Sequence, residues 1–220
     1  MSYGMTDCSG LTGYNIPTNE CNILVTFYNS TSGTGWNDNT GWLTDTDACT
    51  WTGVTCATYT GQDYVTQLDL PYNNLSGTLP DALSGLTYLN ALVLNDNSLT
   101  GTLPAAWGSL QYLNYIHIPY NNLGGELPPA WSGMTALSTF FIEGNNFTGA
   151  LPESWSLLTN MADFVIAQNN FTSSLPASYA SWTNLYRFAA NHNNFTGTLP
   201  DAWTAWANID TISLDENPGL

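Results

Sequence analysis

Basic side chains are almost absent from this 220-residue sequence, which has no lysine and a single arginine, Arg187. Against them stand 17 Asp and Glu residues, so the formal net charge is −16 at pH 7. Because binding to a phosphate backbone requires Lys and Arg to displace counterions, this composition excludes nucleic acid as a partner. An anionic membrane surface is disfavoured for the same reason.

Long apolar runs are absent too. No run approaches the length of about 18 residues that a transmembrane helix needs, so the sequence predicts no membrane span. No basic segment followed by an apolar one opens the chain, so a secreted form is expected to be met here as the mature protein or a fragment. Only 8% of residues are charged, whereas 43% are hydrophobic and 13% aromatic. Such a chain can bury a core, and its surface must be mostly uncharged and polar.

Cysteine is confined to the N-terminal part of the chain, at Cys8, Cys21, Cys49 and Cys56. An even number in one segment predicts two disulfides and an oxidising compartment. The two histidines, His117 and His192, are too far along the chain to complete a zinc site with these thiols. No calcium-loop pattern is present, and Asp38, Asp45 and Asp47 form at best a weak site. We therefore expect no metal and no cofactor.

What the sequence does contain is a repeat. The dipeptide Leu-Pro recurs at one constant interval without an insertion, beginning at Leu79, Leu103, Leu127, Leu151, Leu175 and Leu199. In the same register an asparagine recurs without exception, at Asn73, Asn97, Asn121, Asn145, Asn169, Asn193 and Asn217. We expect each asparagine amide to be buried and to bond the backbone of its own and the adjacent coil, because buried polar groups are partnered.

Apolar residues alternate before each asparagine, which predicts a short strand with one face inward. The innermost column is Leu68, Leu92, Ile116, Phe140, Phe164, Phe188 and Ile212. After the asparagine come a further apolar residue and a glycine, which permits a turn of the backbone. The return path carries two more inward columns at the spacing of one helical turn, the first of which is Leu83, Trp107, Trp131, Trp155, Tyr179 and Trp203.

The resulting pattern, L-x-x-L-x-L-x-x-N-x-[LF]-[ST]-G-x-L-P-x-x-W-x-x-L, resembles the plant-specific class of extracellular leucine-rich repeats. The tryptophan after Leu-Pro is similar to kinetoplastid promastigote surface antigens and related protist surface proteins. The resemblance implies an α/β-type solenoid, a right-handed superhelix of 24-residue repeats with short parallel strands on its concave face. It covers roughly residues 22 to 220 and implies little about function, because the class serves receptors, inhibitors, adhesins and antifreezes.

The N-terminal segment fits the same resemblance. Residues 49–56 read C-T-W-T-G-V-T-C, similar to the C-x-W-x-G-V-x-C element of leucine-rich-repeat caps, which implies a Cys49–Cys56 disulfide. Because the number of cysteines is even, we infer that the remaining two, Cys8 and Cys21, pair with each other. We expect an N-terminal extension and cap over residues 1–63, and six full repeats plus one partial repeat over residues 64–220.

Candidate binding residues lie at the exposed strand positions, which line the concave face where such folds bind. No Ser/His/Asp or Cys/His set converges there, so the chain is not expected to be an enzyme. Asp163 and Arg187 share one column in adjacent repeats, and we expect them to form an ion pair. Several aromatic and polar residues are candidates for a ligand-binding surface: Tyr72, Tyr115, His117, Tyr120, Phe141 and Arg187. The alternative, that they are scattered surface aromatics, stays open at the level of the sequence.

Glycosylation sequons form a further group of candidate sites. The pattern N-x-[ST] occurs at Asn29, Asn74, Asn146, Asn170 and Asn194. Four of them follow the repeated asparagine directly, so the sequon is either an acceptor or a by-product of the repeat.

Together these features predict a non-enzymatic extracellular or cell-surface module that recognises a protein or a glycan. One alternative is a structural subunit of a glycosylated coat or filament. The apolar columns run on to Ile212 and Leu214 without a capping segment, so we expect either a longer array or head-to-tail association. Another alternative is ice binding, because columns such as Ser76, Thr100 and Thr148 could order hydroxyls at strand spacing.

Overall fold

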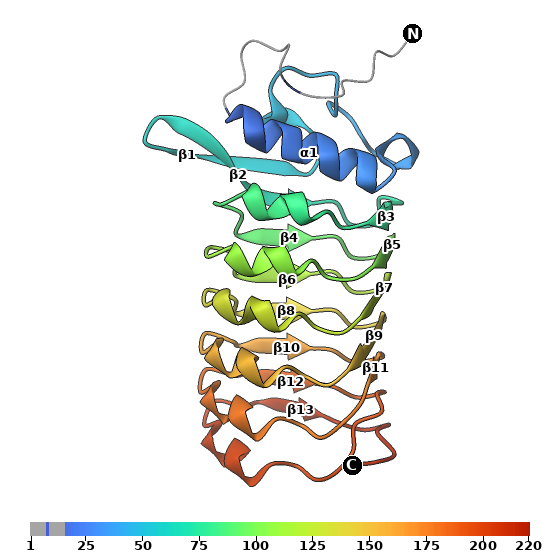
Figure 1. The fold of residues 1–220 in the computed structure, drawn as a ribbon, viewed down its shortest axis with the longest axis vertical. Coiled ribbons are helices and arrows are strands. Elements are labelled where there is room, and N and C mark those ends of the chain that lie inside the picture. Colours follow the sequence, from blue (N-terminus) through green and yellow to red (C-terminus); the bar gives the residue numbers. More distant parts are fainter. Residues whose placement is uncertain (1–7, 9–15) are drawn as a thin grey trace.

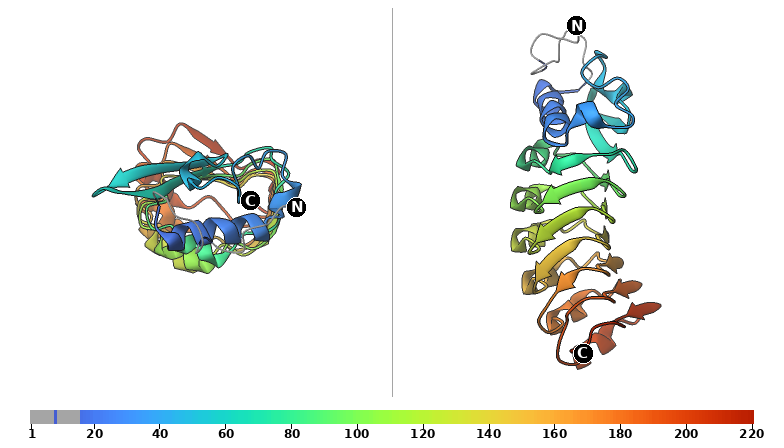
Figure 2. Two further views of the ribbon diagram at one scale, coloured as in Figure 1. Left: turned by 90° about the horizontal axis from the view of Figure 1, so that it is seen from above. Right: turned by 90° about the vertical axis from the view of Figure 1, so that its right-hand side faces the viewer.

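The structure is a computed structural model that describes Cys8 and residues 16–220, which stack as the coils of one solenoid (Figure 1). At its N-terminal end, helix α1 (Thr18–Ser30) lies across the first coil and continues the row of helical turns below it (Figure 2). Leu24, Phe27 and Tyr28 of this helix are buried. The helix thus covers the core edge that the first coil would otherwise expose to solvent.

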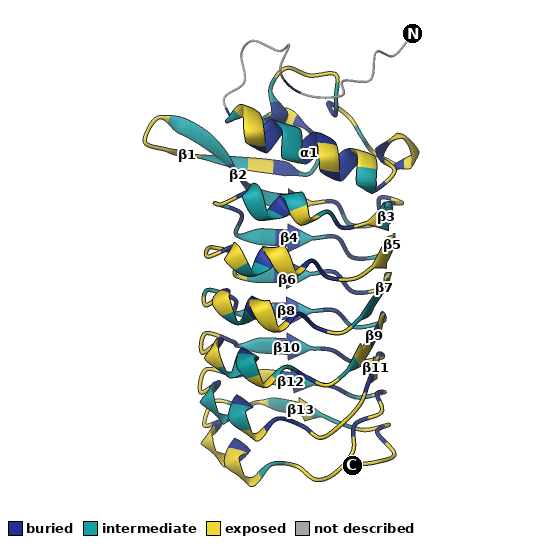
Figure 3. Cartoon of the chain, in the orientation of Figure 1, coloured by how far each residue is buried: buried dark blue, intermediate teal, exposed yellow. Residues whose placement is uncertain are grey.

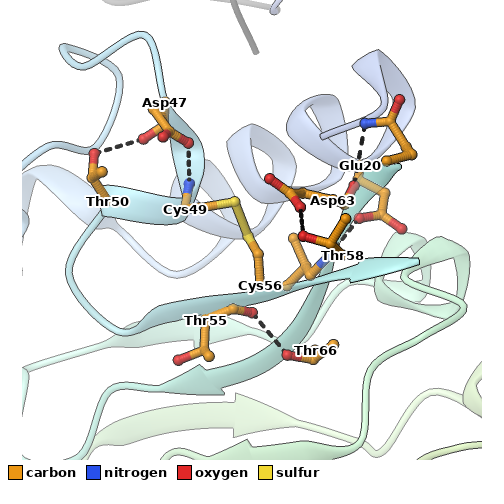
Figure 4. Close-up of a disulfide and its surroundings, with 11 residues drawn as sticks. Glu20, Asp47, Cys49, Thr50, Thr55, Cys56, Thr58, Asp63 and Thr66 are labelled. Carbon is orange, nitrogen blue, oxygen red and sulfur yellow. Dashed lines mark hydrogen bonds between the residues drawn. A yellow bond between two sulfur atoms is a disulfide. The ribbon is translucent and has the colours of Figure 1, made fainter. Parts of the chain in front are cut away.

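The rest of the cap leads into an antiparallel hairpin. Two short 3₁₀ helices, η1 (Gly33–Gly35) and η2 (Ala48–Thr50), precede strands β1 (Val54–Tyr59) and β2 (Gln62–Asp69). Thr66 on β2 donates its hydroxyl to the carbonyl of Thr55 on β1 at 3.2 Å (Figure 4). The tip of this hairpin projects beyond the outline of the coils (Figure 1).

Two disulfides close loops of the cap, Cys8–Cys21 and Cys49–Cys56, which are the two pairs that the sequence predicts. The Asp47 side chain accepts a hydrogen bond from the backbone N–H of Cys49 at 3.0 Å, which holds the second loop (Figure 4). Both disulfides therefore lie in the segment before the repeat begins, where no neighbouring coils on both sides stabilise the backbone.

The longer of two sheets contains one strand from each coil. Its order is β1-β2-β4-β6-β8-β10-β12-β13, and every pair after the hairpin is parallel. The register advances by one repeat, so that Leu68, Leu92 and Ile116 of the predicted inner column are direct partners. The remaining strands of this sheet are β4 (Ala91–Val93), β6 (Tyr115–His117), β8 (Thr139–Phe141), β10 (Asp163–Val165), β12 (Arg187–Ala189) and β13 (Thr211–Ser213).

The return paths form 3₁₀ helices on the opposite side of the coils. They are η3 (Asp81–Gly85), η4 (Ala105–Ser109), η5 (Pro129–Gly133), η6 (Glu153–Leu157), η7 (Ala177–Ser181) and η8 (Asp201–Ala205). Each begins after the proline of the Leu-Pro dipeptide, whose fixed φ suits a helix start. The large side chain of each turn is buried, as predicted. The indole N–H of Trp131 donates to the carbonyl of Pro104 in the preceding coil at 2.9 Å, and that of Trp155 donates to Pro128 at 3.0 Å.

The asparagine ladder has the bonding role that the sequence predicts, and its members are buried except for Asn97, which is partly exposed. In Asn145, which is 6% exposed, Nδ2 donates to the carbonyls of Ile142 in its own coil and Ile118 in the preceding one, both at 3.1 Å. Its Oδ1 accepts from the backbone N–H of Leu123 at 3.0 Å. The same contacts recur at Asn121, Asn169 and Asn193. Each amide therefore joins two coils through their backbones.

A second, five-stranded parallel sheet is not among the predicted features. Its order is β11-β9-β7-β5-β3, along the flank labelled β3 to β11 in Figure 1. The strands occupy the segment expected to be only a turn, and the predicted glycines, such as Gly101 at φ 82°, end several of them. The bounds are β3 (Ser76–Thr78), β5 (Ser98–Gly101), β7 (Asn122–Gly125), β9 (Asn146–Gly149) and β11 (Asn170–Phe171).

The register of this sheet bears on the hydroxyl columns. Thr78 pairs with Thr100 and not with Thr102, its equivalent in the next repeat. Thr100 in turn pairs with Asn122 and not with Gly124. Residues of one sequence column therefore do not lie side by side on this sheet, and Thr100 lies between Thr78 and Asn122. This arrangement differs from the ordered hydroxyl array on which the ice-binding alternative rests.

Candidate functional site

The candidate site is the outward face of the eight-stranded sheet, where alternate residues of each strand leave the core. Along β8, Phe140 is buried whereas Thr139 and Phe141 are partly exposed. Figure 3 shows the same alternation of buried and partly exposed residues along β4, β6 and β10. Because parallel strands lie about 4.8 Å apart, outward side chains of adjacent coils are in contact range.

An aromatic cluster occupies the middle of this face and consists of Tyr115 and His117 on β6 and Phe141 on β8. The ring centroids are 5.5 Å apart for His117 and Phe141, 6.0 Å for Tyr115 and His117, and 6.4 Å for Tyr115 and Phe141. All three side chains are partly exposed, so their rings are packed together and still available to a ligand. The structure thus brings these three predicted residues together.

Arg187 joins the cluster from β12. Its guanidinium carbon lies 6.0 Å from the centroid of the Phe141 ring, at the limit of a cation–π contact. Its Nε lies 3.5 Å from Oδ1 of Asp163, as the sequence predicts, with side-chain exposures of 45% and 27%. An ion pair this exposed contributes little stability.

A polar chain links the cluster to the N-terminal part of the face. His117 Nδ1 lies 3.2 Å from Oδ1 of Asn95, and Asn95 Nδ2 donates to Asp96 at 2.7 Å. An amide oxygen only accepts, so the proton of this bond is on Nδ1. Burial lowers the pKa of His117, which keeps the imidazole neutral at pH 7. A hydrogen bond to Asp96 raises the pKa of Tyr72 and joins that phenol to the same polar chain.

Tyr72 and Tyr120 lie on the loops after β2 and β6 and are not members of the aromatic cluster. Both follow a strand, have a positive φ, and are 68% and 50% exposed. Tyr120 lies over Gly144 so closely that a Cβ there would be 2.5 Å from the ring. The face is therefore a row of loop tyrosines beside a strand cluster, not one compact patch.

Glu143, just after β8, is not among the predicted residues. Its Oε2 is buried without a hydrogen-bond partner within the described part of the chain. Burial raises the pKa of this carboxyl, and the charge of Arg187 opposes that rise. Its column contains proline, asparagine, alanine and aspartate in other coils. The sequence column therefore does not identify Glu143 as a site residue, because the burial of its carboxyl depends on residues of neighbouring coils.

The five sequon asparagines are all exposed. Asn146 and Asn170 begin β9 and β11 of the second sheet, whereas Asn29 lies on α1. Their side chains are accessible, and their glycosylation stays a prediction.

Among residues 8 and 16–220, no group of three or more His, Cys, Asp and Glu side chains could hold a metal ion. Within the same residues, no helix has the length and apolar character needed to cross a bilayer.

The repeat and the sheet together define a leucine-rich-repeat solenoid. Residues 63–123 match the family model described as leucine rich repeat. No functionally curated protein matches the sequence.

Similar solved structures are plant receptor ectodomains. The plant peptide hormone receptor RGFR1, in complex with RGF2, is 30% identical over 67% of this chain and 24% of that chain, with a TM-score of 0.65. The Arabidopsis receptor kinase HAESA, in complex with the peptide hormone IDA and the co-receptor SERK1, is 23% identical over 91% of this chain and 34% of that chain (TM-score 0.77). The ectodomain of SOBIR1 from Arabidopsis thaliana is 20% identical over 94% and 97% of the two chains (TM-score 0.65). This chain spans about a quarter of the length of several such receptors.

Proposed function

We propose that the protein is a non-enzymatic recognition module that binds a protein or peptide on the outward face of its eight-stranded sheet. The observation that carries this proposal is the packing of Tyr115, His117 and Phe141, with the Arg187 guanidinium near the Phe141 ring. Tyrosine and arginine are enriched where proteins bind, because they offer large contact areas at low entropic cost. RGFR1 is named as a peptide hormone receptor, and HAESA as a receptor kinase in complex with a peptide hormone.

An extracellular or cell-surface location belongs to the same proposal. Two disulfides in the cap favour an oxidising compartment. Exposed sequon asparagines fit passage through a secretory pathway. The similarity of the tryptophan column to protist surface antigens points the same way. A glycan ligand is the alternative occupant of the face, since tyrosine and polar side chains also bind sugars.

The test is a binding screen of the intact protein against secreted and cell-surface proteins and glycans from its source. We expect the double substitution Tyr115→Ala and Phe141→Ala to weaken binding by at least about tenfold, the loss typical of interface aromatics. The matched control is Leu157→Ala, which removes a 61% exposed side chain on η6. Equal binding by the double variant, with unchanged circular dichroism, would place the ligand elsewhere.

A further inference from the structure

A small pocket lies where the cap meets the first coil, next to the outward face of the long sheet. Its volume is about 270 Å³, and Asn37, Asp38, Thr52, Asp69, Leu70, Pro71, Tyr72 and Asn73 line it. The lining comes from three segments, the loop after η1, the turn before β1 and the end of β2. The pocket therefore exists only when the cap is docked on the repeats.

Hydrogen bonds across this junction hold the pocket open. Asn73 accepts from the backbone N–H of Asp38 at 2.6 Å and donates its Nδ2 to the Asp38 carbonyl at 2.8 Å. Asn37 donates its side-chain amide to the carbonyl of Tyr72 at 2.9 Å. The first asparagine of the ladder thus bonds the cap instead of a preceding coil. The pocket lining is fixed before any ligand arrives.

The two carboxylates of the pocket are available as charges. Hydrogen bonds from Thr40 and Thr52 to Asp38 lower the pKa of that carboxyl, so it is ionised at neutral pH. Asp69 is exposed, and its carboxylate accepts a long hydrogen bond from the Gln67 amide at 3.4 Å. Arg187, the one Lys or Arg of the chain, lies five strands away along the sheet, about 24 Å. No lysine or arginine of the chain therefore neutralises this pocket.

The remaining walls are apolar or aromatic. Leu70 is buried and Pro71 partly buried, while the Tyr72 ring stands 68% exposed at the rim. A long aliphatic stem with a positive head matches such a lining, because the stem packs on apolar surface and the head reaches carboxylates or an aromatic face. Anionic and purely apolar groups do not match it.

We propose that this pocket binds a lysine or arginine side chain of the protein partner that the outward face recognises. The proposal rests on the proposed function and adds the chemical class of one ligand group. It gives the ligand a position as well, since residues next to a cationic residue bound at the cap can reach the aromatic cluster.

The experiment is a heteronuclear NMR titration of the full chain with small compounds. N-acetyl-lysine methylamide and N-acetyl-arginine methylamide are compared with N-acetyl-norleucine methylamide, which has an aliphatic stem and no charge. We expect the two cationic compounds to shift the backbone amides of Asp38, Leu70 and Asn73 at millimolar concentrations. Norleucine should leave them unchanged.

Isosteric variants separate a pocket from general attraction to an acidic surface. Asp38→Asn and Asp69→Asn retain an oxygen acceptor and should each weaken lysine binding by roughly threefold. Asp201→Asn, which removes an exposed charge on η8, is the matched control and should have no effect. Shifts spread over many acidic residues, or equal loss in the control variant, would overturn the pocket.

A last variant separates this proposal from the proposed function. Phe141→Ala removes part of the aromatic cluster and should leave the lysine titration unchanged. If the partner found by the screen binds Asp38→Asn/Asp69→Asn as tightly as the native chain, the pocket is not part of the interface and the proposal is wrong. If partner binding depends on the pocket and not on Phe141, the proposed function fails in its stated form while the pocket stands.

Discussion

At the scale of single residues, the repeated asparagines decide whether the coils hold together. Each amide satisfies backbone groups that have no sheet partner, as Asn145 does for Ile118, Ile142 and Leu123. A buried backbone group that loses its partner costs about 1–3 kcal/mol. The contribution of one asparagine is therefore large compared with that of a surface residue.

Replacing Asn145 by alanine should lower the free energy of unfolding by about 3 kcal/mol. The buried N–H of Leu123 loses its acceptor, and the carbonyls of Ile118 and Ile142 each lose one of two amide donors. Urea denaturation followed by circular dichroism measures it. Asn146→Ala, one residue on and exposed, should cost less than about 0.5 kcal/mol. A loss below about 1 kcal/mol for Asn145→Ala would show that water replaces the amide.

A buried carboxyl in the cap predicts a pH dependence. Glu20 is 1% exposed and accepts from the backbone N–H of Val65 at 2.8 Å. Desolvation raises the pKa of this carboxyl, and the bond to Val65 partly offsets the rise. A raised pKa in the folded state means that its contribution to stability is fully present below the unfolded pKa, about 4.3, and is lost as the pH rises through the folded value.

Glu20→Gln keeps an oxygen acceptor for Val65 and removes the titration. We expect the variant to gain stability relative to the native chain as the pH rises from about 4 to 7. Thermal unfolding at a series of pH values measures the difference, and Glu126→Gln, at an exposed position, is the control. A difference that is constant with pH would mean that Glu20 does not titrate abnormally.

At the scale of elements, tyrosines brace the projecting hairpin against the coils. Tyr88, in the turn after η3, stacks on Tyr59 of β1 with centroids 4.4 Å apart and on Tyr112 of the next coil at 5.5 Å. Tyr64 of β2 lies 4.5 Å from the same ring. Aromatic pairs contribute about 0.5–1.5 kcal/mol each beyond their buried area.

Tyr88→Ala should therefore speed amide hydrogen exchange at the hairpin by about tenfold while exchange in β8 and β10 stays the same. Tyr186→Ala, which removes an exposed tyrosine just before β12, is the control. Uniform acceleration throughout the chain would show that the stack supports the whole fold and not the hairpin.

The elements also show how far the sequence predicts the fold. The long sheet and the asparagine ladder could be predicted because both advance by one repeat, so that sequence columns are spatial neighbours. The second sheet could not, because its strand partners are offset from the repeat, so that sequence columns are not spatial neighbours there.

The candidate site was predictable to the same extent. Tyr115, His117, Phe141 and Arg187 could be identified because exposed strand positions follow from the columns. Their grouping depends on side-chain directions, which the columns do not give. Glu143 and the pocket beside Asp38 depend on contacts between coils or between cap and coil, and no single column contains that information.

At the scale of the whole molecule, stacking produces one continuous outward face from the cap to β13. Each coil contacts its neighbours, so the face is as rigid as the core beneath it. The chain has a net charge of −16 and one basic side chain, which favours partners with positive charge. A preformed face of this kind loses little conformational entropy when a ligand binds.

The central claim is that this outward face is where a protein partner binds. The most direct measurement is site-specific photocrosslinking, with benzoylphenylalanine placed at Thr139 on β8 or, as the control, at the exposed Thr172 just after β11 of the second sheet. We predict a crosslinked partner from Thr139 alone, which an excess of native chain abolishes and an excess of the Tyr115→Ala, Phe141→Ala variant does not. Crosslinking from Thr172 alone, or competition by the variant as effective as by the native chain, would contradict the account.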